Sequence, residues 1–112
     1  MRLIRLAPDY FCYPLWEASP GQTGDIDPKT LPISLVLQEQ LINWAKVFDQ
    51  ILDMDDPGNN TGFASIEAVI TFNRTGAALA KQLRSELGPE YTIIEKFLRG
   101  EDSVRKTLPP DG

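Results

Sequence analysis

The chain has 112 residues, of which 42% are hydrophobic and 24% charged, a composition typical of one soluble globular domain. It contains no histidine and a single cysteine, which excludes histidine-activated nucleophiles, histidine-ligated zinc and an internal disulfide. The net charge of −5 argues against binding to a nucleic-acid backbone, and the lack of a long apolar run argues for a cytosolic protein without membrane association.

The first third of the chain is predicted to be mostly extended. Residues 2–7 mix charged and apolar side chains in a pattern typical of a half-buried strand that ends at Pro8. Residues 10–16 are rich in aromatic side chains, but Pro14 has no amide hydrogen, so we expect an edge strand or an irregular segment there. Residues 19–32 hold three prolines and two glycines and are predicted to be a loop.

Two amphipathic helices are predicted next. The first covers about residues 34–54, begins at the N-cap candidate Ser34, and has apolar side chains at helical spacing: Leu37, Leu41, Trp44, Ala45, Phe48 and Leu52. The second covers about residues 65–87 and stops at Gly88. Because Gly76 lies inside this helix, we expect it to allow a close approach of the first helix near Trp44.

The remaining residues complete a small α+β domain. Residues 90–97 have the composition of a final strand, and residues 98–112 are predicted to be a flexible tail after a domain of residues 1–97. The order of elements predicts two long antiparallel helices packed on a short sheet of two or three strands. Arg74, Lys81 and Arg84 share one side of the second helix and are expected to face acids of the first.

The negative charge is concentrated in one half of the chain. Residues 1–57 carry nine acids and four bases, whereas residues 58–112 carry seven of each. An acidic excess of this kind is complementary to a basic protein surface, such as one built to hold nucleic acid.

Two groups of carboxylates are candidates for catalysis or metal binding. Asp25 and Asp27 have a spacing compatible with general acid/base work, although an aspartate before a proline more often organises a turn. The segment at residues 53–58 begins like a calcium loop, but Ala64 replaces the bidentate glutamate of such loops. Turn formation by solvated carboxylates is therefore the simpler interpretation, and we predict no metal site and no cofactor.

The aromatic segment around Cys12 is the other candidate region. Cys12 has neither a histidine nor a neighbouring cation to generate a thiolate, so it is expected to be a small buried side chain. Most of the aromatic residues are expected to pack in the core or on the sheet. Tyr13 and Trp16 are expected to stay partly exposed and available to a protein partner.

A series of short motifs runs along the predicted domain: DYFCYPLW at 9–16, GDIDP at 24–28, a helix with Trp44, DDP at 55–57, GF at 62–63 and LGP at 87–89. Together they resemble a group of short bacterial immunity proteins encoded beside contact-dependent or polymorphic toxins. The resemblance covers residues 1 to about 97. It implies a small, acidic, non-catalytic protein that neutralises a cognate toxin, frequently a nuclease, and it implies no residue-level site.

The leading hypothesis is therefore an immunity protein that binds a basic nuclease toxin through an acidic surface. The predicted partner-binding residues are the acids of the first half and two aromatics: Asp25, Asp27, Glu39, Asp49, Asp53, Asp55, Asp56, Tyr13 and Trp16. Two alternatives remain open. One is a carboxylate-dependent enzyme or metal-binding domain that uses Asp25, Asp27 and the acids at 53–56, and the other is a homodimeric structural or regulatory module joined through a sheet edge or through Tyr13 and Trp16.

Overall fold

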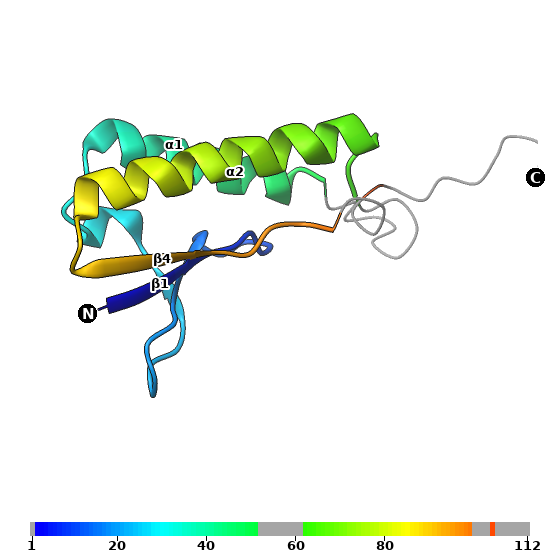
Figure 1. Ribbon diagram of the computed structural model, residues 1–112. Coiled ribbons are helices and arrows are strands. Elements are labelled where there is room, and N and C mark those ends of the chain that lie inside the picture. Colours follow the sequence, from blue (N-terminus) through cyan, green and yellow to red (C-terminus); the bar gives the residue numbers. More distant parts are fainter. Residues whose placement is uncertain (1, 52–61, 100–103, 105–112) are drawn as a thin grey trace, which may run out of the picture.

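Two helices lie side by side on one face of a four-stranded mixed sheet in the computed structural model (Figure 1). The structure describes residues 2–51, 62–99 and 104. Its elements are β1 (Arg2–Leu6), β2 (Leu15–Glu17), β3 (Asp25–Ile26), the 3₁₀ turn η1 (Pro28–Thr30), α1 (Leu35–Asp49), α2 (Ile66–Leu87) and β4 (Tyr91–Glu95). The predicted α+β class and the pair of helices on one sheet face are confirmed.

The sheet is wider than the two or three strands predicted. Its order is β3-β2-β1-β4, with β1 antiparallel to β2 and parallel to β4. Residues 10–14 are irregular, which agrees with one of the two alternatives predicted for residues 10–16. The edge-strand alternative was wrong, because β2 lies between β1 and β3. Pro14 precedes β2, and its carbonyl accepts a hydrogen bond from the Ala7 N–H at 2.9 Å, so its missing donor leaves the ladder intact. The predicted loop at 19–32 also contains β3 and η1.

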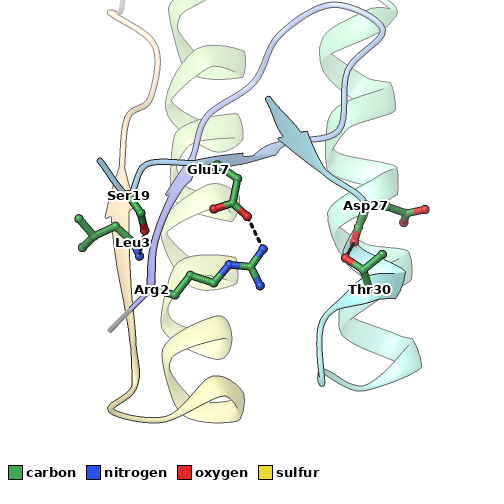
Figure 2. Close-up of polar contacts among 6 residues, drawn as sticks. All are labelled: Arg2, Leu3, Glu17, Ser19, Asp27 and Thr30. Carbon is green, nitrogen blue, oxygen red and sulfur yellow. Dashed lines mark hydrogen bonds and ion pairs between the residues drawn. The ribbon is translucent and has the colours of Figure 1, made fainter. Parts of the chain in front are cut away.

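Polar contacts at two points hold these short elements in register (Figure 2). Arg2 of β1 forms an ion pair with Glu17 of β2, and the Leu3 N–H donates to Ser19 Oγ at 3.0 Å. Beyond β3, the Thr30 hydroxyl donates to the Asp27 carbonyl at 2.7 Å. These bonds fix the segment that carries Asp25 and Asp27 relative to β1.

The core lies between the sheet and the helices. The buried residues of the strands all lie on the sheet face toward the helices: Ile4, Leu6, Leu15, Ile26 and Ile93. The helices contribute Leu41, Val69 and Leu83, none of which is exposed. Full burial of such an aliphatic side chain contributes about 1.5–3 kcal/mol, so this layer is the main source of stability.

Helix α1 begins as predicted and ends early. The Leu37 N–H donates to Ser34 Oγ at 3.2 Å, which confirms the N-cap. The helix ends at Asp49 instead of near residue 54. The Ile51 N–H donates to the Phe48 carbonyl, three residues back instead of four, and the Ile51 carbonyl accepts from the Gly62 N–H. The chain therefore leaves the helix axis at Ile51.

Helix α2 matches its prediction at both ends, with Ser65 as N-cap and Gly88 at φ 81° after the last turn. The close approach at Gly76 is also confirmed, since a Cβ there would lie 2.7 Å from Trp44 Cζ2. Arg84, however, does not face α1. Its guanidinium donates to the Ile93 carbonyl at 2.8 Å and to Glu95 at 2.9 Å, so it covers part of the outer edge of β4.

The chain stays attached to the domain just beyond β4. Asn73 of α2 donates to the Leu98 carbonyl at 3.0 Å and accepts from the Leu98 N–H at 3.1 Å. Val104 forms an isolated bridge with Phe63. Most of the predicted tail, residues 98–112, lies outside the described residues.

Candidate functional site

The loop between β1 and β2 presents an aromatic side chain to solvent. Phe11 is 68% exposed, and its backbone has φ 58°, a conformation that residues other than glycine rarely adopt. The Phe11 N–H donates to Asp49 Oδ1 at the end of α1, at 2.8 Å. A strained residue of this kind costs about 1–3 kcal/mol and persists only where its surroundings hold it, so we take Phe11 as a functional candidate.

Asp25 of β3 holds the next part of the same loop through its backbone, and Asp27, which caps η1, contacts the loop through the Tyr13 phenol. Asp25 Oδ2 accepts a hydrogen bond from the Tyr13 N–H at 2.9 Å, and Asp27 Oδ1 accepts from the Lys29 N–H at 3.0 Å. The charge of Asp27 and its hydrogen bond to the phenol raise the pKa of Tyr13. Tyr13 therefore stays protonated at neutral pH and offers a 40% exposed ring beside two carboxylates.

We define the acidic corner as these side chains together with Asp9: Asp9, Phe11, Tyr13, Asp25, Asp27 and Asp49. Burial and then the charges of Asp9, Asp25 and Asp49 raise the pKa of the Cys12 thiol, whereas Asp27 acts on Tyr13. None of the four carboxylates forms a salt bridge within the described part of the chain. The corner is thus an uncompensated negative surface around two exposed aromatic rings.

Trp16 lies beside the corner, and its side chain makes contacts within the sheet and with the end of β1. Its indole N–H donates to the Ala7 carbonyl at 2.9 Å, and the Arg5 guanidinium lies 5.9 Å from the ring centroid. Its register partner on β3 is Asp25, so both side chains are on the sheet face opposite the helices. Trp16 is half-buried there.

The remaining predicted residues are not all in one place. Glu39 is exposed on the second turn of α1, roughly 15 Å along the helix from Asp49 at 1.5 Å per residue, and lies apart from the corner. Asp53, Asp55 and Asp56 lie outside the described residues. The structure therefore brings together Asp25, Asp27, Asp49 and Tyr13.

Sequence reasoning missed two members of the corner, Asp9 and Phe11. Phe11 was assigned to core or sheet packing, as is usual for a phenylalanine between apolar neighbours. No sequence signal marks a positive φ at a phenylalanine. The contact that creates it joins residues far apart in the chain, Phe11 and Asp49.

The corner is suited to binding rather than to bond chemistry. Cys12 is held in the thiol form by its raised pKa, which opposes a nucleophilic role. Among the residues described, no group of three or more potential ligands could hold a metal ion. The oxygens of Asp25, Asp27 and Asp49 instead receive backbone N–H groups, which fixes where their charges point.

The sequence of the chain matches the model of a known protein family. Residues 2–95 match the family model described as Serratia CdiI immunity protein-like. The chain belongs to this family. Membership confirms the resemblance to contact-dependent toxin immunity proteins and supports a role in toxin neutralisation. No curated protein sequence matches the chain. Neither helix of the described residues combines the length and the hydrophobicity that a membrane crossing requires.

Proposed function

We propose that this protein neutralises a nuclease toxin by binding a basic surface of that toxin through the acidic corner. Family membership supports the toxin as partner. The observation that carries the choice of surface is the group of four carboxylates, without ion-pair partners in the described structure, around the exposed rings of Phe11 and Tyr13. A nuclease presents the complementary charge, because its substrate-binding surface is basic.

The carboxylates mainly raise the rate at which this protein and the toxin associate. Opposite charges on two proteins raise the association rate constant from about 10⁵–10⁶ toward 10⁸–10⁹ M⁻¹s⁻¹ at low salt. Asp25 and Asp49 are held by backbone N–H groups at 2.9 and 2.8 Å, so their negative field keeps one direction. The corner thereby imitates the phosphates of the toxin's substrate.

The aromatic rings act after encounter. The residues that contribute most of the binding energy are enriched in aromatic side chains that act as anchors. Such a residue contributes more when its conformation is fixed before binding, since binding then costs less conformational entropy. Phe11 is such an anchor, because the Asp49 carboxylate holds its backbone in place. Tyr13 adds a second exposed ring at the same surface, with its phenol already hydrogen-bonded to Asp27.

A charge-removal experiment tests this surface, with the toxin domain encoded beside this protein's gene as the probe. In the double variant Asp25→Asn with Asp49→Asn, each asparagine oxygen still accepts the loop N–H, so the corner keeps its shape. We expect the association rate to fall about tenfold at low salt, with a weaker salt dependence, from the lost steering. The matched control, Glu39→Gln with Glu67→Gln, removes two exposed charges elsewhere.

The outcomes separate the parts of the proposal. Equal association rates for the corner and control variants would exclude the corner as the steering surface. Competition by heparin, a polyanion, together with RNA or DNA cleavage by the free toxin, is expected for a nuclease. A toxin that binds but cleaves neither polymer would remove the nuclease assignment and leave the corner assignment standing.

A further inference from the structure

The sheet has one face that no helix of the described chain covers. Both helices lie on the face that carries the core residues, and we call the opposite side the outer face (Figure 1). Side chains alternate between the two faces along each strand, which places Leu3, Arg5 and Trp16 on the outer face. These three side chains are half-buried, and Ile94 of β4 is 41% exposed.

One row of four side chains crosses the outer face from edge to edge. Strand register places Trp16 of β2 between Asp25 of β3 and Arg5 of β1. Arg5 pairs in turn with Ile94 of β4. Because neighbouring strands lie about 4.8 Å apart, the acid and the base are at equal distances on either side of the Trp16 ring.

The two charges of this row have no ion-pair partner in the described part of the chain. The Arg5 guanidinium lies 5.9 Å from the centroid of the Trp16 ring, at a cation–π distance. Within residues 2–51, 62–99 and 104, its side chain forms neither an ion pair nor a hydrogen bond. Asp25 accepts the Tyr13 N–H through Oδ2 and forms no ion pair there. Both charges are therefore available to another molecule.

We propose that the outer face binds a second copy of this chain, with Arg5 of each copy paired to Asp25 of the other. A two-fold axis parallel to β2 and passing over Trp16 places the row face to face with its copy. Acid then lies over base, base over acid, and ring over ring. A two-fold interface requires a self-complementary surface, and the equal spacing on both sides of Trp16 provides one. The strands of the two sheets are then nearly aligned, as is common in stacked sheets.

The same charges fit a basic toxin surface less well than a second copy. Such a surface would attract Asp25 but would place positive charge against Arg5, and like charges in contact oppose binding. A second copy compensates both charges. Because Asp25 also belongs to the acidic corner, a bound copy and a bound toxin compete for it. The dimer itself is independent of the proposed function.

The outer face is small, so we expect a weak and reversible dimer. Its four strands span about 14 Å and the five residues of β1 about 16 Å, an area well below the roughly 800 Å² per partner of a standard interface. The net charge of −5 on each copy adds repulsion. We expect a Kd of about 100 µM at about 150 mM salt. At the nanomolar concentrations of an association-rate measurement the monomer predominates, so the test of the acidic corner is not affected.

Charge reversal with complementation tests the pairing. Arg5→Glu alone places acid against acid at both ends of the row, and Asp25→Lys alone places base against base. By sedimentation equilibrium at about 10 to 500 µM, each variant should raise the dimer Kd at least tenfold. An equimolar mixture of the two variants should form a heterodimer within about threefold of the wild-type affinity, because every acid of the row then meets a base.

The matched controls are Arg74→Glu and Glu67→Lys, which make the same changes of charge at exposed positions of α2. Each should change the dimer Kd less than twofold. Thermal melts check that all four variants fold, since Asp25→Lys loses the hydrogen bond from the Tyr13 N–H. If that variant does not fold, the comparison of Arg5→Glu with Arg74→Glu decides alone.

Four results would overturn the inference. A wild-type protein that sediments as a monomer at every concentration would exclude the dimer. Reversals that act like their controls would place the dimer on another surface. A mixture that stays monomeric, although both components fold, would exclude the pairing of Arg5 with Asp25. A monomeric wild type whose toxin binding is weakened by Arg5→Glu, but not by Arg74→Glu, would assign the outer face to the toxin.

Discussion

The acidic corner and the groove, which is the open hollow between α1 and α2 with Trp44 and Phe72 at its floor, are formed in different ways. The corner combines charged side chains from a loop, from the β3 region and from the end of α1, and backbone N–H groups hold them in place. The groove is formed by two regular helices, and its walls are uncharged. Long-range attraction requires unpaired charge, whereas slow dissociation requires apolar contact without buried charge. Of the two regions, the corner therefore carries the charge that can attract a partner at long range, and the groove does not.

The aromatic residues of the groove and of the corner also differ, because one is buried and the other is exposed. Trp44 is 3% exposed, stacks on Phe72 and approaches Gly76, so its ring is part of the core as well as the groove floor. Phe11 contributes no buried ring and is held by its backbone alone. Substitution of the first should change folding, and substitution of the second should change binding.

The largest expected effect is on stability, from Trp44→Ala. Removing a buried tryptophan leaves a cavity between the helices, and such changes cost about 3–5 kcal/mol in the free energy of unfolding. The indole hydrogen bond to the Phe72 carbonyl is lost as well, which leaves a buried acceptor. Urea denaturation measures this cost. A loss below about 1 kcal/mol would contradict the close packing on which a rigid groove depends.

A smaller effect is expected from Phe11→Ala, on binding alone. Alanine tolerates a positive φ no better than phenylalanine, and the ring is mostly exposed, so the free energy of unfolding should change by less than about 0.5 kcal/mol. Loss of an anchor should weaken toxin binding by at least about 2 kcal/mol, mainly through faster dissociation.

The control for this variant is Leu35→Ala, which truncates a side chain that is 75% exposed at the start of α1, outside the corner. Dissociation rates of both variants are measured against the same toxin domain. If the two truncations had the same effect on dissociation, Phe11 would be no anchor, and the corner would act through charge only.

Local sequence signals were sufficient for three of the four helix ends, and failed only at the end of α1. The caps Ser34 and Ser65 and the stop at Gly88 are read from residues within one turn of each helix end, and all three are present in the structure. The contact between Gly76 and Trp44 was also predictable, because a glycine inside an amphipathic helix has few other uses. The groove between the helices was missed, since its walls carry no apolar periodicity.

Contacts between distant residues account for most of what was missed. The strands β2 and β3 have three and two residues, too few for a periodic pattern, and they exist because β1 pairs with β2 and β2 with β3. Likewise, acidic composition predicted that Asp25, Asp27 and Asp49 matter, but not that they would surround the loop at Phe11. Glu39 belonged to the same compositional group and lies elsewhere on α1. The composition therefore predicted an acidic surface, and only the tertiary contacts show which acidic residues form it.

The smallest expected effect concerns pH and the charged end of the groove. Hydrogen bonds from Gln82 and Ser34 lower the pKa of Glu86 below its usual value of 4.5. Because the folded-state pKa is lower than the unfolded-state pKa, this contribution to stability is present above the unfolded value and is lost as the pH falls through the folded value.

In Glu86→Gln, where the amide oxygen still accepts from the Ser34 N–H, unfolding free energy should therefore fall less steeply with acid below about pH 4.5 than in the wild type. The control Glu39→Gln removes an exposed carboxylate from α1 at a position that does not line the groove. Parallel pH profiles for wild type and Glu86→Gln, from denaturant titrations, would show that the hydrogen bonds to the Glu86 carboxylate do not stabilise the folded protein through its charge.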